Sequence, residues 1–176
     1  DLTRELIAGR PGARIRHLGP ERDLGIFQNL DLSLVPEEEA DLVVCTGLFD
    51  DRSETADDYR DELMRLAARG LTMICANPDL VVESGNRLIP CAGLLAAAYA
   101  ELGGGVIYAG KPHRPVYEAA LAKGAELTGA PVDPGRVMAI GDAIRTDIAG
   151  ARGFGIASLL VARGIHAEEL GVSAEH

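Results

Sequence analysis

Short apolar runs of β-strand character alternate along this chain with stretches of helical periodicity, and this alternation constrains the fold more than any other feature. The clearest runs are 40–46 (ADLVVCT) and 71–76 (LTMICA), and each is bounded by polar or turn-forming residues. Continuous apolar runs of this length suit strands that are buried on both faces, and strands that alternate with helices form parallel sheets. The sequence therefore predicts an α/β fold with a largely parallel sheet.

The predicted elements cover most of the 176 residues. Helices are expected over 2–8, 21–30, 56–69, 93–102, 115–128 and 146–153, and strands over 13–18, 40–46, 71–76, 106–109, 136–140 and 156–161. The stretch 77–91 contains Asn-Pro, Ser-Gly-Asn and Ile-Pro-Cys, which favour a turn and a short hairpin. This stretch is the predicted hinge between two blocks of the chain.

The charge balance argues against two classes of partner. The chain has 17 basic and 27 acidic residues, a net charge of −10, so no basic surface is expected that could bind nucleic acid or an anionic membrane. No run of about 18 apolar residues could span a bilayer, and residues 1–5 lack the pattern of a signal peptide. We therefore expect a cytoplasmic protein, with its three cysteines buried as free thiols.

Two carboxylates stand close together near the C-terminal end. The apolar run 137–140 ends in Gly141 and Asp142, and Asp147 follows five residues later. Paired carboxylates at a strand end suit Mg²⁺, which takes a few oxygen ligands and keeps several waters. We predict that Asp142 is a direct ligand and that Asp147 orients it or holds a metal-bound water. The alternative is that Asp142 only caps the next helix.

A lysine stands in a similar position about thirty residues earlier. Lys111 follows the apolar run 106–109 through Gly110, and Pro112 fixes the entry to the next helix. A lysine at a strand end can neutralise the charge of a phosphoryl group during its transfer. The alternative is a solvated loop lysine.

In this order and spacing, the lysine and the acidic pair resemble the C-terminal motifs of the haloacid-dehalogenase superfamily. The likeness extends to its class IIA branch of nitrophenylphosphatase-like and nucleotide phosphatase-like enzymes, and it covers nearly the whole chain. The matching segments are 74–79, 110–112, 141–142, 146–151, Gly155 and 160–164.

The resemblance implies a Rossmann-like, partial parallel core sheet of three strands over 93–176 and an α/β cap domain over 1–92. It also implies Mg²⁺-dependent hydrolysis of a small phosphorylated metabolite through an aspartyl-phosphate. Lys111 and Asp147 would be catalytic, and Asp142 would bind the metal. A homo-oligomer is compatible with this assignment.

Asn77 and Asp79 lie in a segment that is similar to the turn ending the main part of the class IIA cap. The resemblance implies that they contact the substrate. A plain turn is the alternative, because both side chains readily form hydrogen bonds with nearby backbone groups.

Two departures from the family pattern bear on catalysis. The family's nucleophile lies in an Asp-x-Asp motif, and this motif does not occur in the 176 residues; Asn29 and Asp31 share only its spacing. We therefore expect the attacking aspartate to lie outside this chain. Ala143 stands where relatives often carry a polar residue, and Thr46, at the end of a cap strand, is not expected to bind the phosphoryl group.

Two other functions stay open. An inactive fragment or degenerate relative would bind a metal or a phosphorylated ligand without turnover. A nucleotide-binding or receiver-like α/β module would carry a Gly-rich loop after an early strand, but no G-x-G-x-x-G is present and the three glycines 103–105 precede a strand.

Overall fold

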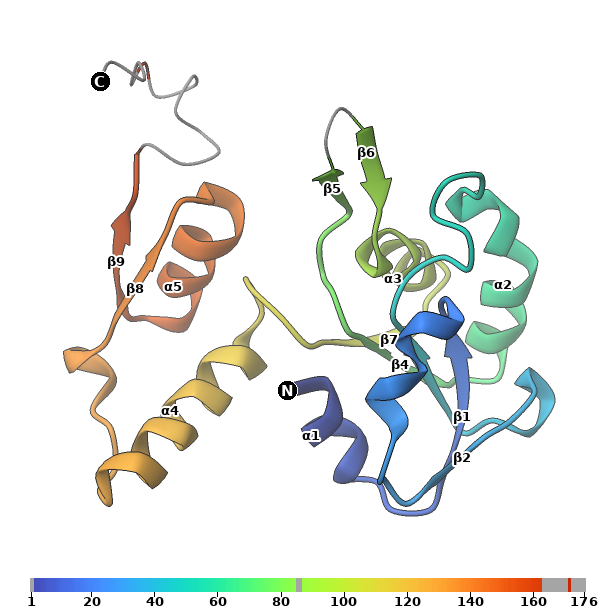
Figure 1. Cartoon of the computed structure of the whole chain (residues 1–176), viewed down its shortest axis with the longest axis horizontal. Helices are drawn as coiled ribbons and strands as arrows, with labels where there is room; N and C mark the ends of the chain where they lie inside the picture. Colours follow the sequence, from blue (N-terminus) through green and yellow to red (C-terminus); the bar gives the residue numbers. More distant parts are fainter. Residues whose placement is uncertain (1, 85–86, 163–170, 172–176) are drawn as a thin grey trace. The chain divides into compact units, whose positions relative to one another are not determined.

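The computed structural model describes residues 2–84, 87–162 and 171, and it divides into two compact units, Asp1–Ala109 and Gly110–His176. The first unit is built on one parallel sheet of five strands (Figure 1). Along the sheet the strands follow the order β2 (Leu32–Leu34), β1 (Ala13–Leu18), β3 (Leu42–Cys45), β4 (Thr72–Cys75) and β7 (Gly105–Tyr108). The predicted α/β fold with a parallel sheet is confirmed.

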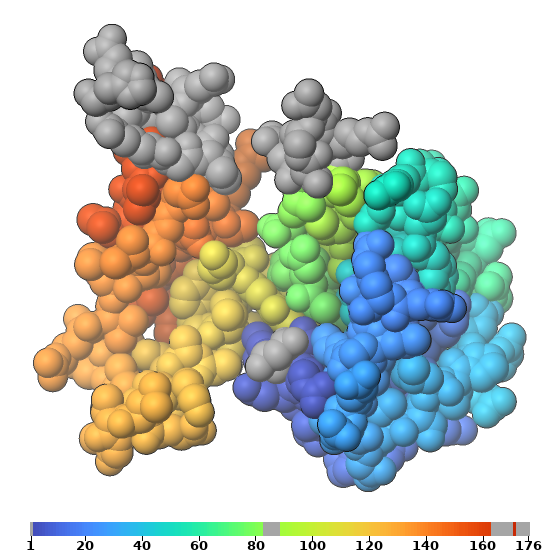
Figure 2. All heavy atoms as spheres, viewed as in Figure 1, coloured from blue at the N-terminus to red at the C-terminus, as the bar shows by residue number. Residues whose placement is uncertain are grey.

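Helices cover both faces of this sheet because its strands alternate their side chains between two apolar cores. On one face, Val43 and Cys45 pack with α2 (Arg60–Ala68) and α3 (Ala92–Glu101). On the other face, Val44 packs with residues of α1 (Leu2–Ala8) and of the 3₁₀ helix Glu21–Phe27. Side chains fill the spaces between these elements (Figure 2).

Shorter elements connect the layers. The 3₁₀ helices Glu37–Glu39 and Ala56–Tyr59 precede β3 and α2, and Thr55 and Asp58 form a capping box at the start of the second. The predicted hairpin within 77–91 is confirmed, since β5 (Val81–Ser84) and β6 (Arg87–Pro90) pair antiparallel.

The second unit contains two parallel strands, β8 (Met138–Gly141) and β9 (Ala157–Leu160). Its helical elements are α4 (Arg114–Thr128), the 3₁₀ helix Pro134–Arg136, the π-helix Ile144–Ile148 and α5 (Ala149–Phe154). The π-helix and α5 take the place of the single helix predicted over 146–153.

The structure places the strand near 106–109 in the sheet of the first unit. This strand, β7, pairs residue by residue with β4, and α3 is the crossover connection between the two. Parallel neighbours need a crossover of this length, and a helix usually supplies it. The second unit therefore has two described strands, and the chain passes from one compact unit to the other after Ala109. The domain bounds 1–92 and 93–176 stay a prediction. The identity of the first unit as a cap stays a prediction.

Two further local differences have visible causes. Within the predicted α-helix 21–30, only Glu21–Phe27 is helical, as a 3₁₀ helix, and Asn29 has a φ of 59°, which no right-handed helix accommodates. Strand β2 has only three residues, which is too short for an apolar pattern to reveal. Among the described residues, no helix is both long enough and apolar enough to cross a membrane.

Candidate active site in the second unit

An ion pair between Lys111 and Asp147 is the centre of the candidate site. Lys111 lies in the loop that follows Gly110, and Asp147 lies in the π-helix after β8. The Lys111 Nζ is 2.6 Å from Asp147 Oδ1, although 36 residues separate them in the sequence. The lysine side chain is 54% exposed and the aspartate side chain only 8%. The pair is thus anchored by a buried carboxylate, while more than half of the lysine side chain is exposed.

Backbone groups hold the second oxygen of the carboxylate. The Ala143 amide donates to Asp147 Oδ2 at 3.1 Å, and the Asp147 amide donates to the Ala143 carbonyl at 2.9 Å. Burial alone would raise the pKa of Asp147, but the hydrogen bonds from Lys111 and from the backbone outweigh burial and keep this pKa below its ordinary value. Asp147 is therefore ionised at neutral pH and holds Lys111 charged beside it.

The glycine that ends β8 makes this arrangement possible. A Cβ added at Gly141 would lie 2.1 Å from Asp147 Oδ2 and 2.2 Å from its Cγ, far inside van der Waals contact. The strand end can approach the carboxylate so closely only because residue 141 has no side chain. The close packing of Asp147 thus explains why a glycine precedes Asp142 in the Gly-Asp motif.

A second close approach lies on the other side of Asp147. Gly150 is packed so that an added Cβ would lie 2.2 Å from the Tyr117 hydroxyl and 2.8 Å from the Cα of Pro112. The Tyr117 ring stacks on Phe154, with ring centroids 5.1 Å apart. The contact at Gly150 therefore joins the loop of Lys111, helix α4 and the segment that carries Asp147.

The hydroxyl of Tyr117 is buried and has no hydrogen-bond partner among the residues that the structure describes. Burial and the charge of Asp147 raise the pKa of this phenol, so it remains protonated. The sequence analysis did not single out Tyr117. Its one sequence signal is an aromatic residue six positions after the lysine, within the first turn of the helix, and core packing explains that pattern equally well.

Asp142 lies at the carboxyl end of β8, where the sequence analysis placed it. Within the described part of the chain, no three His, Cys, Asp or Glu side chains are grouped so that they could hold a metal ion. The Asp147 oxygens accept hydrogen bonds from Lys111 and from the Ala143 amide. Asp147 is therefore placed to hold the lysine and not to bind a metal directly. The carboxylate of Asp142 is a hard oxygen donor that fits Mg²⁺ as one member of a larger ligand set.

Asn77 and Asp79 belong to the first unit. The Asn77 Oδ1 accepts from the Asp79 amide at 3.1 Å, and the Asp79 carbonyl accepts from the Gly93 amide at 3.1 Å. The expected turn is therefore present, and a backbone hydrogen bond connects it to the start of α3. A contact of these two residues with substrate stays a prediction.

His17 and Thr46 lie at the carboxyl ends of the neighbouring strands β1 and β3. The sequence analysis did not predict a contact between them. Their side chains are 2.9 Å apart, between His17 Nε2 and Thr46 Oγ1. The hydroxyl of Thr46 thus has a partner within the first unit. His113 donates its amide to the Gly110 carbonyl, which stabilises the turn around Lys111.

The three cysteines are buried as free thiols, as predicted. Burial raises the pKa of the Cys75 thiol to about 12, and it raises the pKa of Cys45 further. Neutral buried thiols are poor nucleophiles and poor metal ligands.

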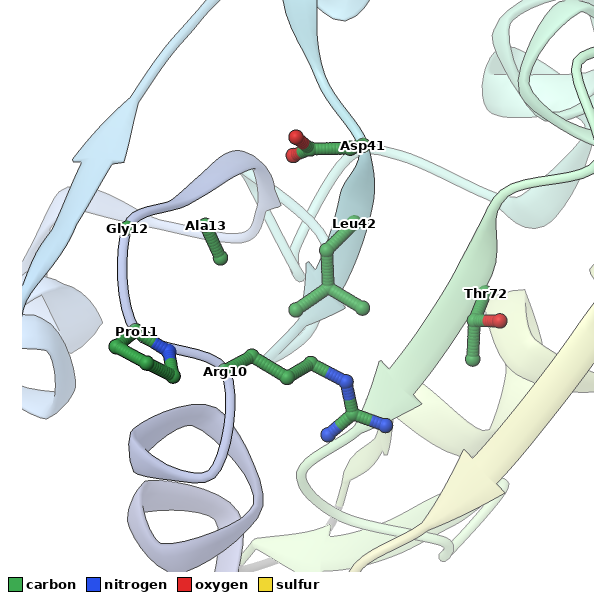
Figure 3. A pocket seen from close by; sticks show the side chains of 7 residues that line it. All are labelled: Arg10, Pro11, Gly12, Ala13, Asp41, Leu42 and Thr72. Atoms are coloured by element: carbon green, nitrogen blue, oxygen red, sulfur yellow. The ribbon is translucent and has the colours of Figure 1, made fainter.

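A hollow of about 320 Å³ at the amino ends of the first unit's strands does not qualify as a catalytic site (Figure 3). Its charged groups are already engaged, since Arg10 Nη1 donates to the Leu6 carbonyl at 2.6 Å and Asp41 Oδ1 accepts from the Arg14 amide at 2.8 Å. Ligands of open α/β sheets bind at the opposite, carboxyl edge.

Known proteins resemble the chain in sequence and in structure. A family model described as HAD-hydrolase-like matches residues 108–176. A hydrolase of the haloacid dehalogenase-like family from Brucella suis is 51% identical, with a TM-score of 0.82 over 100% of this chain and 67% of that one. No curated protein matches the chain.

Two phosphatases are more distant neighbours. A p-nitrophenyl phosphatase from Archaeoglobus fulgidus is 26% identical, with a TM-score of 0.69 over 90% of this chain and 58% of that one. A glycerol phosphate phosphatase from Mycobacterium tuberculosis, in complex with calcium, is 27% identical, with a TM-score of 0.64 over 90% and 45%. The chain thus spans between about half and two thirds of the lengths of these relatives.

The close approach at Gly141 predicts a large effect of one methyl group. Gly141→Ala should lower the free energy of unfolding by about 1–3 kcal/mol, because the added Cβ must displace a carboxylate that is held on both oxygens. Gly153→Ala is the matched control, since a Cβ there meets nothing within 4 Å; it should raise stability by up to about 1 kcal/mol. Urea denaturation measures both, and equal effects of the two variants would contradict the assignment.

The buried hydroxyl of Tyr117 predicts an unusual response to its removal. Tyr117→Phe should leave the free energy of unfolding unchanged or raise it by up to about 1 kcal/mol, because a buried, unpartnered hydroxyl is destabilising. The Tyr99 hydroxyl, by contrast, donates to the Leu71 carbonyl at 2.7 Å. Tyr99→Phe removes this hydrogen bond and should lower the free energy of unfolding by about 1 kcal/mol. A fall of the same size in both variants, measured by urea denaturation, would show that the Tyr117 hydroxyl has a partner.

Proposed function

Because this chain belongs to the haloacid dehalogenase-like hydrolases, we propose that the protein hydrolyses phosphate monoesters with the help of Mg²⁺. The observation that carries the proposal is the ion pair between Lys111 and Asp147, in which a partly exposed lysine that follows an apolar strand is held by a buried carboxylate. Two relatives are named as phosphatases, which agrees with this reaction, although the names describe those proteins and not this chain.

Lys111 would stabilise the negative charge of the phosphoryl group as it is transferred. A lysine ammonium is a compact point charge with three donors, and a fixed charge of this kind is worth most where it needs no rearrangement during the reaction. Asp147 would act as a positioning residue, since it fixes the ammonium group at 2.6 Å and reaches solvent very little itself. Gly141 and the Ala143 amide in turn hold Asp147.

Asp142 would bind Mg²⁺ together with ligands from outside this chain and with water. When bound, the ion supplies positive charge that polarises the phosphoryl oxygens. Asp142 suits this role because it directly follows Gly141, the last residue of β8, at the carboxyl edge where such sheets bind ligands.

The attacking group would be an aspartate outside the 176 residues, because no Asp-x-Asp occurs among them. Its carboxylate oxygen would form a bond to phosphorus while the bond to the alcohol oxygen breaks, and the alcohol would leave with a proton. Water would then release phosphate from the aspartyl-phosphate and restore the carboxylate. Covalent catalysis of this kind divides one difficult step into two easier ones.

The substrate would be a small phosphorylated metabolite. Asn77 and Asp79 are the candidate substrate contacts from the first unit, in the turn that is fastened to α3 through Gly93. The second candidate function is ligand binding without turnover, and the absence of an Asp-x-Asp from this sequence favours it for the chain by itself.

Replacing the lysine tests the catalytic assignment. In a longer form of the protein that includes an upstream Asp-x-Asp, Lys111→Ala should lower kcat for p-nitrophenyl phosphate about 100-fold or more, because the transferred charge loses its partner. Lys123→Ala removes an exposed lysine that pairs with Glu126 and should have no effect. The 176-residue chain alone should show no turnover, and turnover equal to that of the longer form would place the nucleophile within these residues.

Replacing Asp142 tests the metal assignment separately. Asp142→Asn should weaken the binding of Mg²⁺ about tenfold or more in calorimetric titration at millimolar metal, since a charged ligand becomes a neutral one. Asp147→Asn should weaken binding less, because that carboxylate is bound to Lys111. The control is Asp133→Asn, in the exposed turn before the 3₁₀ helix Pro134–Arg136. Identical affinities in Asp142→Asn and the control would refute the role of Asp142.

A further inference from the structure

The first unit contains the feature that marks ligand sites in open α/β sheets. Strands β2 and β3 lie on opposite sides of β1. After β1 the chain forms the 3₁₀ helix Glu21–Phe27, which packs on one face of the sheet, and after β3 it leads to α2, which packs on the other. The two loops therefore diverge at the carboxyl ends of β1 and β3, and ligands of such sheets bind in the crevice at this switch point.

The base of this crevice is fixed. His17 Nε2 and Thr46 Oγ1 are 2.9 Å apart, and the Thr46 amide donates to the Leu18 carbonyl at 2.8 Å. Gly19 lies so close that an added Cβ would be 2.0 Å from the Thr46 hydroxyl. The Phe27 ring and the His17 imidazole pack edge to face, with centroids 5.0 Å apart. The strand ends are thus held in place without a ligand, as a preformed site requires.

A groove of about 500 Å³ opens above this base. Its lining is mostly apolar, and three of its large apolar side chains, Leu24, Leu34 and Phe49, are exposed to solvent. The polar part of the lining is Arg16, His17 and Glu21. A volume of this size accommodates a small organic molecule and is too small for a protein segment with its own core.

Arg16 supplies the charge that selects the ligand. Its Nε donates to a Glu62 oxygen at 2.6 Å, and its guanidinium lies over the Phe49 ring at 5.8 Å. The side chain is 27% exposed, and its two Nη groups donate to no acceptor among the described residues. Terminal guanidinium nitrogens with this geometry match the two oxygens of a carboxylate.

We propose that this groove binds a small carboxylic acid with an aromatic or branched apolar body. The carboxylate accepts hydrogen bonds from the Nη groups of Arg16, and the apolar body lies against Phe49, Leu24 and Leu34. A monoanion fits better than a phosphate dianion, because Glu62 already offsets part of the Arg16 charge and Glu21 lies at the same groove. This binding activity uses none of the residues of the proposed hydrolase reaction.

Titration of the 176-residue chain with benzoate, followed by amide NMR shifts, tests the proposal. Saturable shifts are expected near 16–19, 34–36 and 46–49, and benzamide, the uncharged analogue, should bind at least fivefold more weakly. Arg16→Met should abolish binding. Glu62→Gln should strengthen it about threefold or more, since it removes a competing negative charge from a partly exposed pair.

Arg10→Met is the matched control, because it removes an arginine from the hollow at the amino edge of the same sheet (Figure 3); it should leave benzoate affinity unchanged. Phe49→Ala, an exposed position, replaces Arg16→Met if that variant does not fold, and it should weaken binding at least fivefold. Equal binding of benzamide, shifts that do not saturate, or full affinity in Arg16→Met or Phe49→Ala would overturn the proposal. All of these readouts are independent of phosphatase activity, so they separate this inference from the proposed reaction.

Discussion

A carboxylate that is almost withdrawn from solvent determines the structure of the second unit. Asp147 would be costly to bury alone, since an unpaired charge loses its hydration without compensation. Lys111 and the Ala143 amide provide that compensation. Their positions require an approach that only Gly141 permits, and π-helical geometry places the carboxylate where they meet. The Gly-Lys loop, the Gly-Asp strand end and the irregular helix are therefore parts of one electrostatic arrangement.

The sequence allowed good prediction of strands but poor prediction of the sheet to which each belongs. Apolar runs revealed β3 and β4 because both faces of these strands are buried. The same local pattern could not show that β7 pairs with β4, because strand pairing depends on contacts between residues far apart in the chain. The place of β7 in the first sheet was missed for this reason, and β2, with three residues, gave no readable pattern.

For the site, the motifs placed Lys111 and the acidic pair each after a strand, and the structure joins Lys111 to Asp147. Spacing could not reveal which of the two carboxylates would pair with the lysine. That choice depends on the turn geometry after Gly141. Nor could it reveal Tyr117, since a tyrosine in an amphipathic helix has the same pattern whether or not its hydroxyl finds a partner.

The two strands of the second unit expose large apolar side chains. Ile140 pairs with Leu159 in register, and both side chains, together with Met138, are exposed on the strand pair. Parallel sheets are otherwise covered on both faces, and exposed apolar strands are what chaperones bind and what drives aggregation. The stability of this unit therefore depends on what packs against these side chains, since each apolar group that is removed from water adds to the folding free energy.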